Sequence, residues 1–284
     1  MVSHRTLAAV APLLLSTVSA WGAPNYGGFE RLWQETFAGP AGASPNRGNW
    51  NIIQGNLGYN DELQRYTASN SNLQVSGGET LQIIPKRDGG GWTSGRIEST
   101  YTIKPRPGKV TKLEAIIRFG GNGIDGKKGI WPAFWILGDA HRHGTAWPAC
   151  GELDIMETIN GQLTGYGTVH CDVFPGGVCN EGNGIGSGTG FPNQNWHTWT
   201  IEIDRRPTNW QDQSITWFTD GRQFHQVKGH RINKFDVWAS LTDRPLYFIL
   251  NLAVGGKWPG PPNGNTLDGY GSMMEVGYVA HYST

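Results

Sequence analysis

The stretch Gly151-Glu152-Leu153-Asp154-Ile155-Met156-Glu157-Thr158 places three carboxylates within six residues of an otherwise largely apolar run. Such a run predicts a buried strand, where an acid is costly unless it is paired or has a function. Because side chains alternate between the faces of a strand, Glu152 and Asp154 share one face and Glu157 points to the other. A bulge of one residue around Ile155-Met156 would return Glu157 to the face of the other two acids.

The spacing of these acids predicts a particular chemistry. With one bulged residue, the Cα atoms of Glu152 and Glu157 lie roughly 13 Å apart at about 3.3 Å per residue. Two Glu side chains that lean together reduce the distance between their carboxylates to about 5–6 Å, which suits a retaining glycosidase. Asp154 would hold this arrangement in place and help to decide which acid carries the proton. For this pattern alone, a half-exposed strand with a solvated acidic face is the alternative.

The first twenty residues have the features of an export signal. His4 and Arg5 precede an apolar run from Leu7 to Leu15, and small residues precede position 21. This apolar run is too short to span a bilayer, and no later segment is apolar enough to anchor the chain in a membrane. We therefore expect a secretory signal peptide at 1–20 and one soluble, extracellular catalytic domain at 21–284, with no membrane partner.

The composition indicates an all-β protein. Charged residues make up 16% of the chain and balance to zero net charge, which argues against nucleic acid as a partner. About a dozen short segments of strand character alternate with turns, and no helix of convincing length occurs. We expect a concanavalin-like β-jelly-roll sandwich of two curved antiparallel sheets. The Gly-rich stretch 182–190 is expected to be a mobile loop, and about half of the 13 Trp residues are expected to line a groove for sugar rings.

Three cysteines leave two interpretations open. In an exported protein, a Cys171–Cys179 bridge would close a nine-residue loop and leave Cys150 free and buried. The alternative is a metal site formed by His170 and the two nearby Cys residues. That alternative lacks a second pair of ligands at a recognisable spacing.

Several motifs together resemble glycoside hydrolase family 16. They cover nearly all of residues 21–284 and occur in the order found in that family. They are Asp61-Glu62-Leu63-Gln64-Arg65-Tyr66-Thr67, Ser94-Gly95-Arg96-Ile97, Gly129-Ile130-Trp131-Pro132-Ala133-Phe134-Trp135, Trp147-Pro148-Ala149-Cys150-Gly151-Glu152-Leu153-Asp154-Ile155-Met156-Glu157, Asn195-Trp196-His197-Thr198-Trp199 and Leu250-Asn251-Leu252-Ala253-Val254-Gly255-Gly256-Lys257-Trp258-Pro259-Gly260. Six motifs in one order are far more specific than any one of them.

The resemblance implies an activity and roles for the acids. The spacing Glu-x-Asp-x-x-Glu is similar to that of laminarinases, whereas lichenases and xyloglucan transferases usually carry Glu-x-Asp-x-Glu. This implies a retaining endo-β-1,3- or 1,3(4)-glucanase acting on β-glucan, with Glu152 as nucleophile, Glu157 as general acid/base and Asp154 as the assisting carboxylate. A glucan transglycosylase using the same site and a non-catalytic jelly-roll lectin are the alternatives.

Substrate-binding roles follow from the same resemblance. Trp131, Trp135 and Trp147 match positions near the catalytic strand, although Trp135 is also a candidate for the core. Arg96 matches an arginine that bonds sugar hydroxyls, with a solvated surface arginine as the alternative. The resemblance further implies two positions, His170 and Trp258. His170 is expected to bond a sugar hydroxyl or Glu157, or else to cap the Cys loop, and Trp258 is expected to stack on sugar.

No cofactor and no metal are expected. Many relatives bind a structural calcium through an acid in the first strand and an Asp in the last strand. Here Gly277 stands where that Asp would be, and Thr36 takes the place of the other acid. Without these hard oxygen ligands we expect no calcium. We further expect a monomer.

Overall fold

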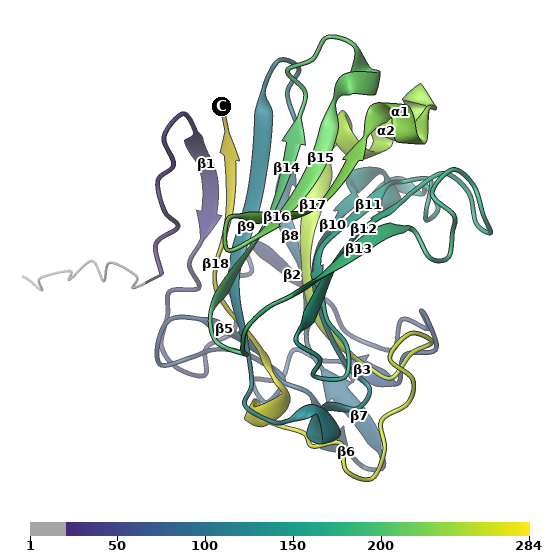
Figure 1. The fold of residues 1–284 in the computed structure, drawn as a ribbon. Coiled ribbons are helices and arrows are strands. Elements are labelled where there is room, and N and C mark those ends of the chain that lie inside the picture. The colour runs from purple at the N-terminus through teal and green to yellow at the C-terminus, as the bar shows by residue number, and fades with distance from the viewer. Residues whose placement is uncertain (1–20) are drawn as a thin grey trace, which may run out of the picture.

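The computed structural model describes residues 21–284, so the expected export signal at 1–20 lies outside the described residues. Two large antiparallel sheets pack face to face in the predicted jelly-roll sandwich (Figure 1). The first runs in the order β16 (Arg222–Lys228), β15 (Ser214–Thr219), β14 (His197–Asp204), β9 (Val110–Phe119), β18 (Met274–Ser283), β5 (Leu81–Ile83) and β4 (Leu73–Val75), with β1 (Glu30–Glu35) also paired to β18.

The second large sheet carries the acidic stretch. It runs in the order β13 (Ile185–Gly190), β12 (Thr164–His170), β11 (Glu152–Glu157), β10 (Ile130–Gly138), β17 (Leu246–Val254), β8 (Arg96–Ile103) and β2 (Trp50–Ile52). A small third sheet consists of β3 (Gln64–Tyr66), β7 (Gly91–Ser94) and β6 (Lys86–Asp88), and its β3–β7 pair is parallel.

The helices are short. The described part of the chain has two α-helices, α1 (Gly229–Ile232) and α2 (Phe235–Thr242), and four 3₁₀ turns, η1 (Ile124–Lys127), η2 (Asp139–His143), η3 (Trp210–Asp212) and η4 (Tyr270–Ser272). No helix within residues 21–284 combines the length and the apolar character needed to cross a membrane. The strands therefore form the framework that positions the acids.

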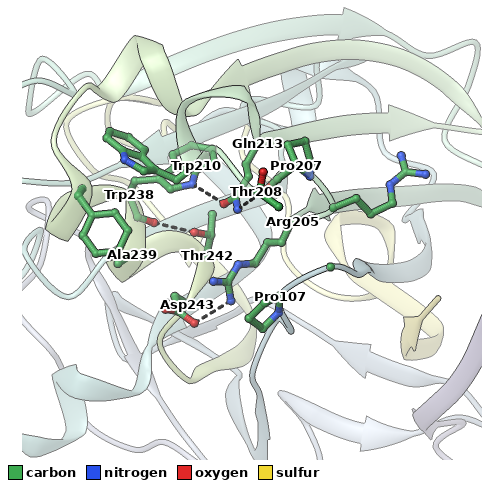
Figure 2. A pocket seen from close by; sticks show the side chains of 13 residues that line it. Pro107, Arg205, Pro207, Thr208, Trp210, Gln213, Trp238, Ala239, Thr242 and Asp243 are labelled. Carbon is green, nitrogen blue, oxygen red and sulfur yellow. Dashed lines mark hydrogen bonds and ion pairs between the residues drawn. The ribbon is translucent and has the colours of Figure 1, made fainter.

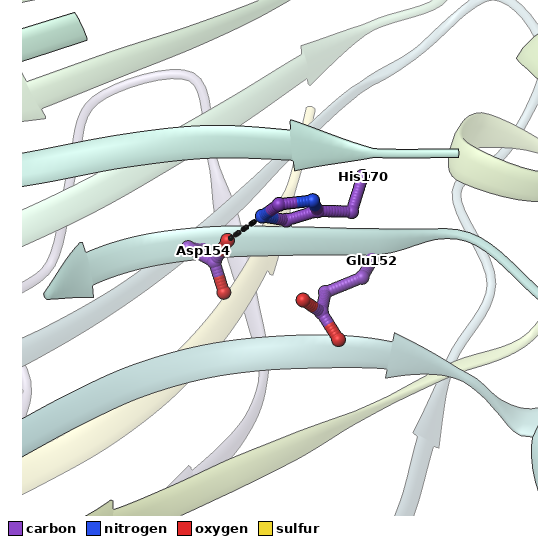
Figure 3. Close-up of side chains that lie close together, drawn as sticks. All are labelled: Glu152, Asp154 and His170. Atoms are coloured by element: carbon purple, nitrogen blue, oxygen red, sulfur yellow. Dashed lines mark ion pairs between the residues drawn. The ribbon is translucent and has the colours of Figure 1, made fainter. Parts of the chain in front are cut away.

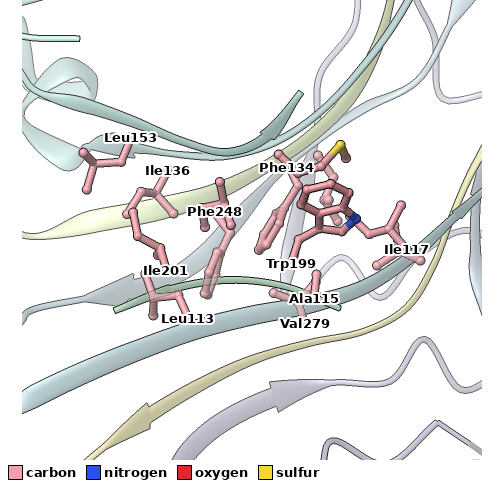
Figure 4. Close-up of a cluster of buried hydrophobic side chains, with 14 of the residues drawn as sticks. Leu113, Ala115, Ile117, Phe134, Ile136, Leu153, Trp199, Ile201, Phe248 and Val279 are labelled. Atoms are coloured by element: carbon pink, nitrogen blue, oxygen red, sulfur yellow. The ribbon is translucent and has the colours of Figure 1, made fainter. Parts of the chain in front are cut away.

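The core lies between the two large sheets (Figure 4). Leu153 of β11 packs inward there, with Phe134 of β10 and Trp199 of β14. All three side chains are fully buried. Because neighbours along a strand face opposite ways, the acids beside Leu153 project from the outer face of the seven-stranded sheet.

Five tryptophans are buried, namely Trp50, Trp92, Trp199, Trp217 and Trp238. Two of them explain the glycines of β12. A Cβ at Gly165 would lie 2.2 Å from the Trp199 ring, and one at Gly167 would lie 2.4 Å from the Trp217 ring. The indole of Trp217 also donates to the Asp154 carbonyl at 2.6 Å. The packing of this core ring thus supports the backbone of the acidic strand.

The prediction of a mobile loop at 182–190 was wrong, because Ile185–Gly190 forms the edge strand β13. Its glycines make room for side chains of β12. A Cβ at Gly186 would lie 2.9 Å from the hydroxyl of Thr168, and one at Gly188 would lie 3.0 Å from the Tyr166 ring. The glycines therefore reflect close packing on a neighbouring strand.

A cavity of about 360 Å³ lies beside α2 (Figure 2). The Arg205–Asp243 ion pair, at 2.7 Å, lines it together with Trp238, whose indole donates to Gln213 at 3.0 Å. None of the three acids of β11 is among its lining residues. Glu152, Asp154 and Glu157 therefore do not line this cavity.

Replacing Gly167 with Ala should destabilise the fold. The added methyl group would overlap the Trp217 ring, and overpacking of a filled core costs about 1–3 kcal/mol. Urea unfolding followed by fluorescence measures this loss. Gly190→Ala is the matched control, because its nearest neighbour would be 3.9 Å away. Equal stability of the two variants would contradict the packing described for β12.

Candidate active site

The predicted bulge is present at Ile155. On the β10 side, Asp154 pairs with Trp135 and Met156 with Phe134, so Ile155 has no partner of its own. The pairing of β11 with β12 shifts at the same place, between Asp154 and Glu157. One residue of β11 is therefore extra relative to both neighbouring strands.

This extra residue brings the three acids to one face. Opposite Glu152, Asp154 and Glu157, β10 presents residues that are two positions apart and so share a face: Leu137, Trp135 and Ala133. The partners on β12 follow the same rule: His170, Thr168 and Tyr166. The sequence-based prediction that Glu157 returns to the side of Glu152 and Asp154 is thus confirmed.

The acids occupy a site that disfavours negative charge. Burial raises the pKa of Glu157 to about 7, although the positive charge of His170 and the hydrogen bond from Trp131 oppose the rise. The Trp131 indole donates to Glu157 Oε1 at 2.9 Å. Burial also raises the pKa of Glu152, against the opposing effects of His170, Arg96 and Trp147. Glu157 is therefore able to keep a proton near neutral pH.

Asp154 lies between the two glutamates on the same face of β11. Burial and the charges of Glu157 and Glu152 raise its pKa well above the usual range. Its Oδ2 lies 3.4 Å from Nε2 of His170 (Figure 3) but makes no well-formed hydrogen bond. The positive charge of His170 lowers the pKa of all three acids and so partly offsets the effect of burial.

His170 faces Asp154 with one nitrogen and Glu181 with the other. Its Nδ1 lies 2.7 Å from Glu181 Oε2. Burial would lower the pKa of His170, but the hydrogen bond with Glu181 and the charges of Asp154 and Glu152 outweigh it and raise the pKa to about 10. Of the alternatives expected for His170, the hydrogen bond with Glu157 is not formed, because both ring nitrogens are turned to other carboxylates, one of them Glu181 just after the Cys loop.

Polar groups continue the site across β17 and β8. Arg96 is buried and bonds Glu98 through Nε and Nη2, at 3.0 and 2.7 Å. Its guanidinium lies 5.0 Å from the Trp135 ring, and the indole of Trp135 donates to Asn251 at 2.7 Å. The alternative of a solvated surface arginine was therefore wrong, and Trp135 belongs to the same polar layer as Arg96.

Aromatic rings stand on both sides of the acids. Beside Glu157, Trp258 makes edge contacts with Trp131 and Tyr166 at centroid distances of 5.6 and 5.1 Å. On the other side, Trp147 lies 5.7 Å from the His170 ring and 6.0 Å from the exposed Phe174. Trp258 and Trp147 are themselves 42% and 38% exposed, so both retain surface for a ligand. Four tryptophans lie near the acids, namely Trp131, Trp135, Trp147 and Trp258. This is fewer than the expected half of the 13, and five of the others are buried.

The cysteine loop contains the most important residue that the sequence did not reveal. Cys171 and Cys179 form the predicted disulfide, and Cys150 is free and buried, so the alternative metal site with these cysteines was wrong. Glu181, just after the bridge, has a side chain with 0% exposure. Nothing in its Gly-rich surroundings distinguishes it from a loop acid. Tyr166 and Phe174 were missed for a similar reason, since only the fold brings them beside Trp258 and Trp147.

One group of possible metal ligands occurs beside the acids. Ligand atoms of Glu152, Asp154 and His170 lie within 4.8 Å of one another among the described residues. A histidine ligand must be neutral and must offer a free nitrogen lone pair. The pKa of His170 is raised to about 10, so its ring is protonated at neutral pH and offers no lone pair there. The absence of a metal remains a prediction.

The surroundings of Gly277 agree with the expectation that no calcium binds. A Cβ there would lie 2.6 Å from the Trp21 ring and 2.8 Å from Ile116, so an Asp has no room without rearrangement. The neighbouring acid Glu35 accepts hydrogen bonds from Thr36 N and Phe37 N through one carboxylate oxygen. The absence of calcium remains a prediction.

The jelly roll, its acidic row and its flanking aromatic rings together define a glycoside hydrolase. Residues 60–270 match the family model of Glycosyl hydrolases family 16, and the chain belongs to this family. A glucan endo-1,3-beta-glucosidase of Cryptopygus antarcticus is 30% identical, over 96% of this chain and 97% of that protein. Glucan endo-1,3-beta-glucosidase A1 of Niallia circulans is 29% identical over 91% of this chain, which spans 38% of that relative's length.

The structural comparison agrees with this assignment. The crystal structure of endo-1,3-beta-glucanase from Streptomyces sioyaensis matches with a TM-score of 0.86 and 36% identity, over 92% of this chain and 99% of that one. The lectin alternative is thereby replaced by membership of an enzyme family.

The raised pKa of Glu157 predicts a pH-dependent stability. A carboxyl group with a pKa of about 7 in the folded state, against an ordinary 4.5, binds its proton more tightly when folded. Its stabilising contribution is complete below pH 4.5 and is lost as the pH rises through 7. Glu157→Gln removes this loss, so the variant should gain on the order of 1–3 kcal/mol relative to the parent between pH 4.5 and pH 8.

Urea unfolding of both proteins at several pH values measures this gain. Glu30→Gln, at an exposed position of β1, is the control and should show no such trend. A stability difference between Glu157→Gln and the parent that stays constant with pH would contradict the assignment.

Proposed function

We propose that this family 16 enzyme is a retaining endo-1,3-β-glucanase. The observation that carries the proposal is the bulge at Ile155, which puts Glu152 and Glu157 on one face with Asp154 between them. The similarity of the chain to the 1,3-glucanases named above supports cleavage of the β-1,3 linkage. Mixed β-1,3-1,4 glucans are a second proposed substrate class.

In the first step, a carboxylate oxygen of Glu152 attacks the anomeric carbon while Glu157 gives its proton to the leaving oxygen. The glycosidic bond breaks, and a glycosyl ester forms on Glu152. In the second step, Glu157 removes a proton from water, which attacks the anomeric carbon and releases Glu152. The same pair of carboxyl groups therefore serves both steps.

The electrostatics of the site fit this cycle. Glu157 has a pKa of about 7 and begins the reaction protonated, while Arg96 and His170 favour the ionised form of Glu152. Ester formation removes the negative charge of Glu152. The pKa of Glu157 then falls, which prepares it to act as a base.

The aromatic rings favour cleavage inside a polymer. Exposed rings lie beyond Glu157, at Trp258, and beyond His170, at Trp147 and Phe174. Sugar rings stack on such faces, so a glucan is held on both sides of the bond that breaks. Export and action as an extracellular monomer are part of the same proposal, and the Cys171–Cys179 bridge supports an oxidising compartment.

Glu152→Gln should abolish hydrolysis of laminarin, with a loss of at least roughly 10⁴-fold in kcat, because the amide cannot form the ester. A reducing-sugar assay measures the loss, and circular dichroism checks the fold. Glu202→Gln, on β14 of the opposite sheet, is the matched control and should retain activity. Residual activity of Glu152→Gln near that of the parent would exclude Glu152 as the nucleophile.

A further inference from the structure

The loop that follows β12 holds a buried carboxylate against His170. Glu181 Oε2 lies 2.7 Å from His170 Nδ1, and Glu181 Oε1 accepts the Cys171 backbone N–H at 2.7 Å. The side chain of Glu181 has 0% exposure and that of His170 has 15%. A fully buried carboxylate is expensive unless it is paired and hydrogen-bonded. Both requirements are met by these two contacts.

The loop is fixed at several points. The Cys171–Cys179 disulfide closes it, and the backbones of Gly176 and Glu181 exchange two hydrogen bonds. At its beginning, Asp172 accepts from Val178 N at 3.0 Å and pairs with Lys234 of the adjoining helical region at 2.9 Å. The position of Glu181 is thus determined by covalent and polar contacts within the loop.

The ring of His170 is surrounded by negative groups. Its Nε2 faces Asp154 Oδ2 at 3.4 Å, and Glu152 is its partner residue on β11. The titratable groups facing it are Glu181 from the loop and these two acids from β11, while the Trp147 ring and the backbone of Gly184 complete its surroundings. A neutral imidazole donates from only one nitrogen, so ionised carboxylates at both nitrogens favour the doubly protonated ring, which donates to Glu181 and places its positive charge 3.4 Å from Asp154.

We propose that Glu181 is a positioning residue for hydrolysis, which holds His170 as an imidazolium facing Asp154 and Glu152. The loop closed by Cys171–Cys179 keeps Glu181 in place. The positive ring stabilises the ionised form of Glu152 before attack and limits the repulsion among the three acids of β11. Neither Glu181 nor the disulfide touches the reacting atoms, and both act through His170.

Nuclear magnetic resonance of the imidazole nitrogens tests this directly. In the parent enzyme, ¹⁵N shifts of His170 should show both nitrogens protonated from pH 5 to pH 9. In Glu181→Gln the ring should instead titrate within that range, because the paired charge is gone. Glu202→Gln, on β14 of the opposite sheet, is the control, since it removes a carboxylate far from the loop; it should leave His170 protonated throughout. A neutral His170 at pH 7 in the parent would overturn the proposal without any variant.

Kinetics supply the second readout. In Glu181→Gln at pH 7, a neutral His170 no longer lowers the pKa of Glu152, and the ionised fraction of Glu152 falls tenfold for each unit by which that pKa rises. We therefore expect a loss of roughly tenfold in kcat/KM at pH 7. At pH 5 the loss should be much smaller, because His170 of the variant is still protonated there. The Cys171→Ser/Cys179→Ser variant should show a smaller loss with the same pH trend. A loss that does not vary with pH would reduce Glu181 to a structural role and overturn the proposal.

This inference rests on the proposed hydrolysis of glucan, but the two fail in different ways. An imidazolium His170 in an enzyme that does not cleave laminarin would support the Glu181–His170 pair and refute the proposed substrate. A neutral His170 in an enzyme that cleaves laminarin would refute the role of the Glu181–His170 pair and support the proposed substrate.

Discussion

One extra residue in β11 determines what the rest of the site is able to do. The bulge at Ile155 places Glu157 on the outer face of the sheet, while Ile155 itself remains buried in the core. A regular strand would turn Glu157 away from Glu152. The core supports this geometry from below, where Trp217 of the opposite sheet donates to the Asp154 carbonyl. The register of β11 and the packing beneath it therefore both fix the face on which Glu157 lies.

The resulting row of acids requires nearby positive charge and donors. The half-buried Glu152 and the buried Asp154 and Glu157 lie on one face, and desolvation raises the pKa of each. The two glutamates share one cation and differ in their other partners. His170 lowers the pKa of both, Trp131 donates to Glu157, and Arg96 and Trp147 lower the pKa of Glu152. The additional charge of Arg96 favours the ionised form of Glu152, the group that attacks.

Much of this arrangement was predictable from the sequence. The alternation of acids with apolar residues predicted the bulge and the shared face, because both depend on local strand geometry. Glu181, Tyr166 and Phe174 were not predictable, since their roles depend on contacts made only when distant segments come together. The stretch 182–190 was misjudged because glycine permits flexibility and close packing alike, and only the neighbouring side chains of β12 decide between them.

The bulge in β11 places Glu152 and Glu157 on one face, as a double-displacement mechanism requires. The most direct test is proton nuclear magnetic resonance of the first products released from laminarin, before mutarotation changes their anomeric ratio. Two successive inversions at the anomeric carbon return the β configuration, so β-anomers should appear first. Initial release of α-anomers would mean a single displacement by water and would contradict the account of both glutamates.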